Sequence, residues 1–445
     1  MTAVERHVGV PVTGDQQAVL RRRISGVLVA SQILGGLGVA TGVALASVLA
    51  QRISGTESLS GLAPTAMVTG TAVASMPLAA LMTARGRRPG LVLGYLVGAL
   101  GAGVVVVAAV IDSFPLLLCG MAGFGAASSA NLGARFAAAD LAEPDRRARA
   151  ISNVVWAATI GAVLGPNIAA PAGRSVSGLG IPATAGPFLW ASGIFLVAAV
   201  TVAVLLRPDP LLTARALAPV EERSAEGRSL RAGFAAVAAS PRARLALVAV
   251  AVCHTAMVSV MSMTPVALGH HGASIDLIGL VISGHIAGMY AFSPLMGRLS
   301  DRFGRLSGIG LAVGLLACAA LLAGTAGGSH GRTAAGLFVL GLGWSAGLVS
   351  GSALLTDSVP EAARAAAQGL SDLVMNTSAG LGGAAAGLAM AQAGYGWLNL
   401  GAACLLIPVG ALALFTRRDL KQVRGIGGSA SAAHRTTASP PDSAG

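Results

Sequence analysis

The sequence predicts an all-α membrane protein with twelve transmembrane helices, arranged in two pseudo-symmetric halves of six helices each. Three observations support this: the composition, the positions of the basic residues and an internal repeat. Of the 445 residues, 54% are hydrophobic and 11% are charged, and the mean hydropathy is +0.74. A soluble domain carries about 25% charged residues, so this composition excludes a water-soluble globular protein.

Twelve apolar stretches are candidates for membrane spans, because a helix needs about 20 residues to cross the hydrocarbon core. The predicted spans are 24–50, 62–82, 91–111, 114–139, 150–172, 186–206, 245–268, 277–296, 306–323, 333–355, 365–390 and 397–415. We therefore expect five segments: a cytoplasmic arm (1–23), an N-terminal six-helix half (24–206), a cytoplasmic linker (207–244), a C-terminal six-helix half (245–415) and a disordered cytoplasmic tail (416–445).

The basic residues predict the orientation of these spans. If both termini are cytoplasmic, 26 of the 30 Lys and Arg residues lie in inner segments and three in outer loops, and Arg135 lies within a span. Cytoplasmic loops carry an excess of Lys and Arg, so we expect a multi-pass protein of the cytoplasmic (inner) membrane with both termini inside. Contact with the bilayer accounts for the net charge of +12, and no nucleic-acid partner is expected.

The two halves repeat at a nearly constant offset of about 218 residues. The matching segments are Gly86-Arg87 with Gly304-Arg305, Gly123–Gly125 with Gly341–Gly343, and Ser152–Val155 with Ser371–Val374. Parallel six-helix repeats are a transporter architecture, in which the substrate site lies near mid-membrane between the halves.

Direct use of ATP is excluded by the sequence. A phosphate-binding loop requires Gly-Lys followed by Ser or Thr, but the single lysine, Lys421, follows Leu420. The chain also lacks a His-Glu-x-x-His zinc motif. We expect a protein that is not an enzyme, has no cofactor, works as a monomer and depends on an ion or solute gradient.

The segment Gly297–Arg305, Gly-Arg-Leu-Ser-Asp-Arg-Phe-Gly-Arg, resembles the loop signature of the major facilitator superfamily. Its first-half copy, Thr83–Gly90, has Thr83 where the family has Asp. The resemblance implies the superfamily fold and a loop that holds one conformation and releases it during transport. The loop residues so implied are Gly297, Asp301, Arg302, Gly304, Arg305, Gly86 and Arg87.

Ionisable residues within spans are usually functional. Arg135 and Asp372 must face a cavity or each other, since exposure to lipid costs several kcal/mol. Spacings of four residues place Asn131 with Arg135 on one helix face, and Gln368, Asp372 and Asn376 on another. Asp372 is either a proton or cation site or one member of a structural ion pair.

Two pairs with four-residue spacing, Met257/Met261 and His285/Met289, lie on consecutive predicted spans. Thioether, thiol and imidazole groups suit Cu(I), so the candidate metal ligands are Cys253, His254, Met257, Met261, His285 and Met289. The surrounding segments resemble the facilitator branch that contains a bacterial copper importer and riboflavin-transporting relatives. Three interpretations stay open: metal transport, an organic substrate in the same cavity, or packing alone.

A different motif favours export. Gly161–Pro166 resembles the antiporter signature of drug-exporting facilitators, although the closing Gly-Gly of that signature is Ala169-Ala170 here and Cys119 replaces the family's basic residue. The alternative to uptake is therefore a proton-coupled drug or metabolite efflux antiporter.

We expect a secondary transporter that moves a small molecule or a metal ion by alternating access, with copper or flavin-like uptake favoured. Trp156, Trp344 and Tyr290 could stack on a flat organic molecule. The predicted cavity residues are Gln32, Asn131, Arg135, Trp156, Met257, Met261, His285, Met289, Trp344, Asp372 and Asn376.

Overall fold

A computed structural model describes residues 14–56, 59, 62–217, 230–273 and 275–436, and the regular elements in these ranges are helices. The first half contains α1 (Gly14–Ser54), α2 (Leu62–Arg85), α3 (Arg87–Val110), α4 (Phe114–Asp140), α5 (Arg147–Ser175) and α6 (Gly186–Leu205). The second half contains α9 (Pro241–His270), α10 (Ile275–Tyr290), α11 (Ser293–Phe303), α12 (Arg305–Gly324), α13 (His330–Asp357) and α14 (Arg364–Thr436).

Each predicted span coincides with helix, and the all-α membrane fold is confirmed. Among the described residues, ten helical stretches are long and apolar enough to cross a membrane. One of them, within α14, contains two predicted spans, because Gly394 has a left-handed φ of 82° and ends the first helix there. The predicted span 277–296 is divided between α10 and α11. Helix α5 is not among the ten, and its sequence includes two Asn and two Pro residues.

The predicted linker and tail differ from the structure. Two short helices, α7 (Pro210–Leu217) and α8 (Leu230–Ala239), lie within 207–244. Helix α9 begins at Pro241 because Ser240 caps it, its hydroxyl accepting from the Ala243 amide. Helix α14 continues to Thr436 instead of becoming disordered at 416. Residues 420–424 are mainly good helix formers, whereas residues 425–436 include three glycines and their propensity does not explain the extension. Residues 437–445 lie outside the described part.

Each half has an apolar core, and each core also includes at least one residue of the other half. In the first half, Phe124 contacts the rings of Phe188 and Phe195 at centroid distances of 5.8 and 5.3 Å. Glycines bring the surrounding helices close together, as small residues do in membrane bundles. A Cβ on Gly125 of α4 would lie 2.2 Å from the Met67 carbonyl of α2.

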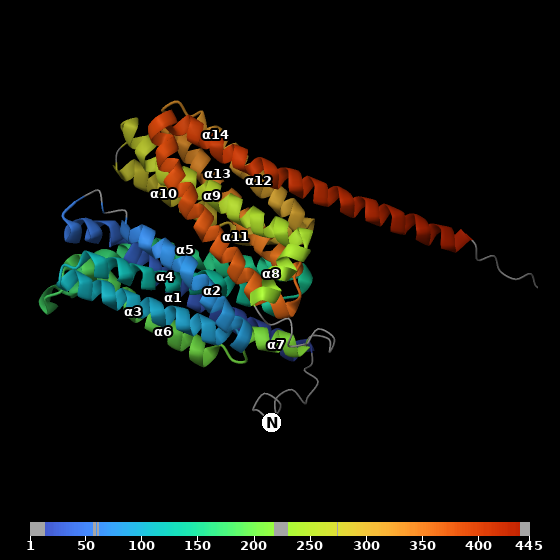
Figure 1. Cartoon of the computed structure of the whole chain (residues 1–445), viewed down its shortest axis with the longest axis horizontal. Helices are drawn as coiled ribbons and strands as arrows, with labels where there is room; N and C mark the ends of the chain where they lie inside the picture. Colours follow the sequence, from blue (N-terminus) through green and yellow to red (C-terminus); the bar gives the residue numbers. More distant parts are fainter. Residues whose placement is uncertain (1–13, 57–58, 60–61, 218–229, 274, 437–445) are drawn as a thin grey trace, which may run out of the picture.

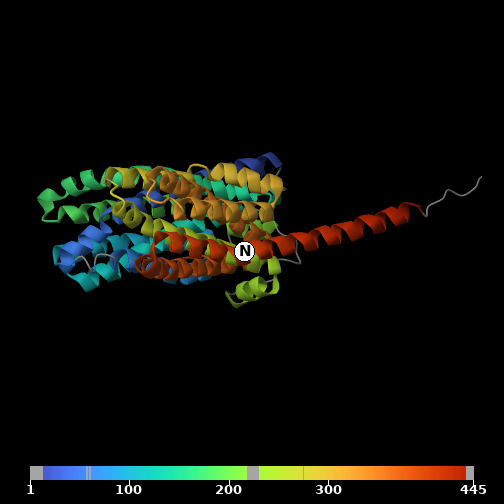
Figure 2. The same ribbon diagram turned by 90° about the horizontal axis from the view of Figure 1, so that it is seen from above.

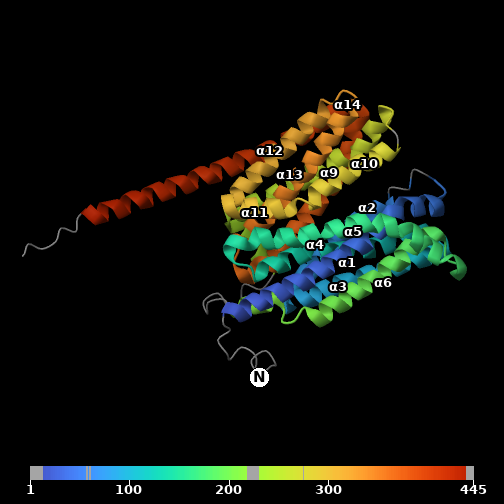
Figure 3. The same ribbon diagram turned by 180° about the vertical axis from the view of Figure 1, so that it is seen from behind.

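The two halves lie side by side, come together at one end and diverge toward the other (Figures 1 and 3). We call the end where they meet the basic end, because α7, α8 and the turns after α2, α4 and α11 lie there with most of the loop arginines. Figure 2 shows the last part of α14 extending beyond the bundle at this end. Arg52 lies at the opposite end, within 3.4 Å of Asp112.

Candidate functional site

A buried ion pair, which we call the central ion pair because it joins the two halves, lies five residues before the end of α4 and eight residues after the start of α14. Arg135 of α4 lies 2.5 Å from Asp372 of α14 (Nη2 to Oδ1), and both side chains are at least 93% buried. The Arg135 Nε also donates to the Ser352 hydroxyl of α13 at 3.3 Å, and Nη1 donates to the Leu132 carbonyl at 2.8 Å. This central ion pair therefore holds one residue of the first half against two helices of the second.

The polar stripe predicted on α14, formed by Gln368, Asp372 and Asn376, makes contacts both within its own helix and with the first half. Asn376 donates to the Asp372 carbonyl at 2.8 Å, within its own helix. Gln368 reaches the first half by accepting from Arg87, and its amide donates to Thr356 at 3.2 Å. Two of the three stripe residues thus bind arginines of the first half.

Arg87 is a buried residue of α3 rather than an exposed loop residue. Its Nε and Nη2 donate to the carboxylate of Asp140, at 2.7 and 3.1 Å, and it also donates to Gln368. This two-point geometry is the strongest form of an arginine–carboxylate contact. The sequence singled out Arg87 only as part of the loop signature, and the packing of α2, α4 and α14 places it inside.

The second loop copy contacts the start of α5. The Asp301 carboxylate accepts from the amides of Ala148 and Arg149, at 3.2 and 2.9 Å. Arg305 donates to Asp301 and lies 3.0 Å from Asp357, which also pairs with Arg147 at 2.6 Å. A carboxylate at a helix N-terminus is stabilised by the free amides and the helix dipole, so Asp301 ties the second half to the first.

The first loop copy is built differently. The Thr83 hydroxyl donates within its own helix, to the Ala79 carbonyl at 2.7 Å. A carboxylate comes instead from the linker, where Asp209 accepts from the Arg88 amide at 2.7 Å and caps α7 through the Leu211 amide at 3.0 Å. The sequence analysis did not identify Asp209, although an acidic residue before a proline is a recognisable helix start.

The repeat appears in the geometry of the turns and of the contact surfaces. Gly86 and Gly304, 218 residues apart, have matching left-handed φ angles of 93° and 90°. A Cβ on Gly297 would lie 2.1 Å from the Ser152 hydroxyl of α5, and one on Gly369 would lie 2.1 Å from the Ala79 Cβ of α2. Ala79 precedes Gly297 by 218 residues. Small residues thus allow both pairs of helices to touch at the basic end.

Three aromatic rings of the second half, those of His254, Tyr290 and Trp344, form an aromatic cluster. The Trp344 Nε1 donates to His254 Nδ1 at 2.7 Å, and the Tyr290 ring meets the Trp344 ring edge to face at 5.5 Å. Trp344 lies on α13 eight residues before Ser352, whose hydroxyl accepts from Arg135. The aromatic cluster therefore lies about two helical turns from a contact of the central ion pair.

The predicted metal ligands are distributed over two helices that both pack on α13. His285 is buried, and its Nδ1 lies 2.8 Å from the Leu337 carbonyl, whereas its Nε2 has no partner among the described residues. Cys253 lies against Gly347 of α13. Met257 and Met289 are buried, and Met261 is half-buried. In the described ranges, no group of three or more His, Cys, Asp and Glu residues could hold a metal.

The remaining predicted cavity residues lie in the first half. Asn131 accepts from the Tyr95 hydroxyl at 3.2 Å, so it turns toward α3. Gln32 is buried, and its Oε1 lacks a partner within the described part of the chain. Trp156 is 41% exposed, and no ring contact joins it to the aromatic cluster in the described residues.

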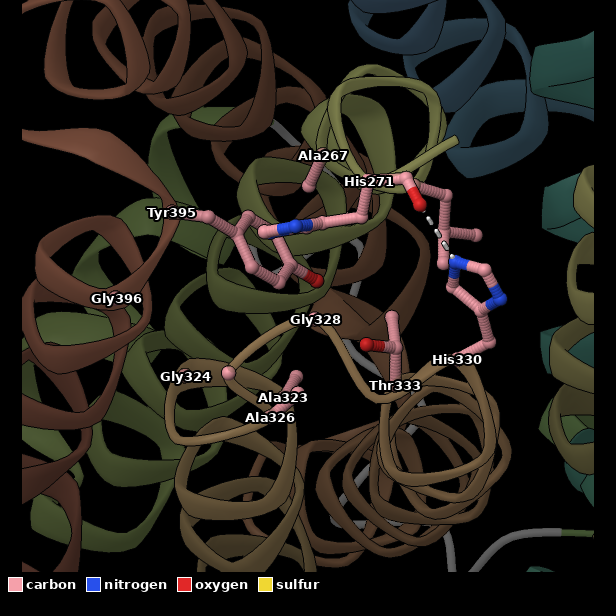
Figure 4. A pocket seen from close by; sticks show the side chains of 12 residues that line it. Ala267, His271, Ala323, Gly324, Ala326, Gly328, His330, Thr333, Tyr395 and Gly396 are labelled. Atoms are coloured by element: carbon pink, nitrogen blue, oxygen red, sulfur yellow. Dashed lines mark hydrogen bonds between the residues drawn. The ribbon is translucent and has the colours of Figure 1, made fainter. Parts of the chain in front are cut away.

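A cavity of about 220 Å³ opens at the end opposite the basic end, within the second half. Figure 4 shows His271, His330, Thr333 and Tyr395 around it. The His330 Nε2 lies 3.2 Å from the His271 carbonyl. No sequence pattern predicts this cavity, because its walls come from the ends of three helices and the bend at Gly394.

Comparison with known proteins identifies the family. Residues 27–272 and 245–439 match the Major Facilitator Superfamily. The uncharacterized MFS-type transporter YddS of Bacillus subtilis (strain 168) is 38% identical over 295 residues, which cover 65% of this chain and 67% of that protein. The riboflavin transporter RfnT of Brucella anthropi is 30% identical over 307 residues, which cover 69% of this chain and 74% of that protein.

Solved structures share the fold. The transporter FucP in the outward conformation superposes with a TM-score of 0.69 at 16% identity, over 88% of this chain and 98% of that one. A bacterial homologue of the iron transporter ferroportin in an outward-facing state gives a TM-score of 0.65 at 15% identity, over the same shares of the two chains. Together with the ten candidate spans of the described residues, the repeated turns and the loop signature, these matches show that the chain is a multi-pass membrane transporter of the major facilitator superfamily.

Proposed function

We propose that this protein takes up a small, flat aromatic solute of the flavin type across the cytoplasmic membrane, driven by protons. The observation that carries the proposal is the central ion pair, which joins the two halves and contacts α13, the helix that also carries Trp344 of the aromatic cluster. The relative named as a riboflavin transporter supports the choice of solute. With the basic end in the cytoplasm, the conformation described here is closed on the inside.

Proton coupling follows from the charge of the pair. To open the basic end, Arg135 must move away from Asp372. Separating a buried pair leaves its charges without partners, which costs about 3–5 kcal/mol. Protonation of Asp372 leaves only the arginine charged, and water or solute in the opened cavity can solvate it. Movement of the halves is therefore easiest when a proton is bound.

Substrate recognition is expected to depend on Trp344. Stacking of a flat ring on an aromatic side chain contributes about 1–3 kcal/mol, so Trp344→Ala should weaken riboflavin binding roughly 5- to 150-fold. The measurement is riboflavin uptake into liposomes with an acidic exterior, over a range of concentrations. Trp397→Ala is the matched control, because Trp397 is 66% exposed on α14. Uptake that tolerates loss of Trp344 as well as it tolerates loss of Trp397 would refute this assignment.

The direction of transport is tested in the same liposomes. The export alternative draws support from α5, where a Cβ on Gly161 would lie 2.5 Å from the Gly36 carbonyl carbon and one on Gly165 would lie 2.4 Å from the Ala40 Cβ. The small residues of the antiporter signature allow α1 and α5 to pack closely. Symport accumulates riboflavin on the side opposite the acidic compartment, whereas antiport accumulates it in the acidic compartment.

Copper uptake is a second candidate, favoured by the unpartnered Nε2 of buried His285, one helical turn before Met289. If Cu(I) is the substrate, cells expressing His285→Ala should accumulate less copper than cells with the native protein, at equal protein levels. His270→Ala is the control, since His270 is exposed at the end of α9. Equal copper contents in cells with the two variants would reject Cu(I) as the substrate and favour the organic solute.

A further inference from the structure

A groove between α1 and α5 at the basic end carries an excess of positive charge. It has a volume of about 410 Å³, within the range of small-molecule sites. Four arginines line it (Arg21, Arg22, Arg146 and Arg149) together with the acidic Glu143. Glu143 pairs with Arg21 at 2.5 Å and with Arg146 at 3.5 Å.

Two of these arginines remain available for a ligand. The side chains of Arg22 and Arg149 are exposed, and no hydrogen bond or ion pair joins either guanidinium to another residue in the described ranges. One carboxylate against four guanidinium groups leaves the groove with a net charge of +3. Such a site attracts an anion that can bind several arginines at once.

The groove lies where apolar and charged segments meet. Three predicted spans border the groove: one begins at residue 24, one ends at residue 139 and one begins at residue 150. The apolar lining of the groove includes Ile24, Ala138 and Ala150. Figure 3 shows α1 and α5 side by side on the near face of the first half. Beyond Arg149, the exposed side chains of Trp156 and Leu164 continue along α5. A ligand there would meet arginines at one end and an apolar helix face at the other.

We infer that this groove binds an anionic phospholipid of the inner leaflet, with its phosphate between Arg22 and Arg149 and an acyl chain along the exposed face of α5. Basic pockets on the cytoplasmic side of membrane proteins are suited to such headgroups. The site is separate from the solute site, because its lining residues belong to the first half and do not include the central ion pair or the aromatic cluster.

Arg149 connects the groove to the contact between the halves. The side chain of Arg149 lines the groove, while its backbone amide donates to Asp301 of the second half at 2.9 Å. Its neighbour Arg147 pairs with Asp357. A lipid that immobilises Arg149 therefore also stabilises the start of α5 in the position that Asp301 binds, and favours the closed basic end.

The test compares lipid retention by the purified full chain, measured by native mass spectrometry with phosphatidylglycerol or phosphatidylcholine. Each arginine near an anionic lipid contributes about fivefold to affinity, so Arg22→Gln combined with Arg149→Gln should weaken phosphatidylglycerol binding about 25-fold. Phosphatidylcholine binding should not change. The control is Arg231→Gln with Arg298→Gln, which removes the same charge from exposed sites elsewhere at the basic end.

Equal phosphatidylglycerol retention by the two double variants would overturn the inference. So would competition by glycerophosphoglycerol, the headgroup without acyl chains, at the same concentration as the lipid, because the groove would then be a site for soluble anions. Neither measurement involves transport, so failure of the lipid site and failure of the proposed function are distinguishable.

Discussion

Gly369→Val is expected to hold the basic end open. The added side chain would overlap Ala79, since a Cβ at this position already lies 2.1 Å from the Ala79 Cβ. Overpacking costs about 1–3 kcal/mol, and the cost applies only while α2 and α14 touch. The population of the closed basic end should therefore fall about 5- to 150-fold relative to the open state. Gly297→Val should act in the same way at the contact between α11 and α5.

The measurement is the distance between spin labels on Arg85→Cys and Pro360→Cys, two exposed positions on opposite halves at the basic end, with the native cysteines replaced by serine. The control is Gly310→Val on α12, where an added Cβ meets nothing within 4 Å. A label distance that stays the same in the Gly369 and Gly297 variants would show that these contacts do not keep the end closed.

Asp372→Asn should abolish uphill solute uptake driven by a pH gradient while sparing exchange of solute between the two sides. The asparagine cannot take up a proton, and it leaves Arg135 buried without a counter-charge. Removing one partner of a buried pair costs about 3–5 kcal/mol, so the closed state should lose that stability as well. Uptake and counterflow in the same liposomes separate the two activities.

The matched control for this variant is Asp112→Asn, which makes the same chemical change at an exposed carboxylate far from the centre of the molecule. Uphill uptake that persists in Asp372→Asn, with protein levels equal to the control, would place the proton site elsewhere.

Sequence alone predicted the spans, the halves and the repeat, because each depends on composition or spacing that a membrane constrains strongly. It also identified Arg135 and Asp372 as residues that must face a cavity or each other, since lipid exposure of either charge is costly. The structure brings them together. Likewise, the family signature identified Asp301, and the structure places its carboxylate at the start of α5.

Sequence could not predict how each helix is rotated. Membrane helices are apolar on all sides, so their periodicity carries little information about which face is buried. The Trp344–His254 contact and the burial of Arg87 against Gln368 both depend on rotation. The exposed position of Trp156 on α5 does as well. Asp209 joins the linker to the first half, a long-range contact that local sequence does not encode.

The two edges along which the halves meet differ in their exposure to water. At the start of α5, the Arg149 amide that donates to Asp301 is exposed, and the Arg147–Asp357 pair is partly exposed. At the start of α14, Arg87 with Gln368 and Arg135 with Asp372 are buried. Salt screens exposed charges much more strongly than buried ones. A rise in ionic strength should consequently loosen the edge at α5 before the edge at α14.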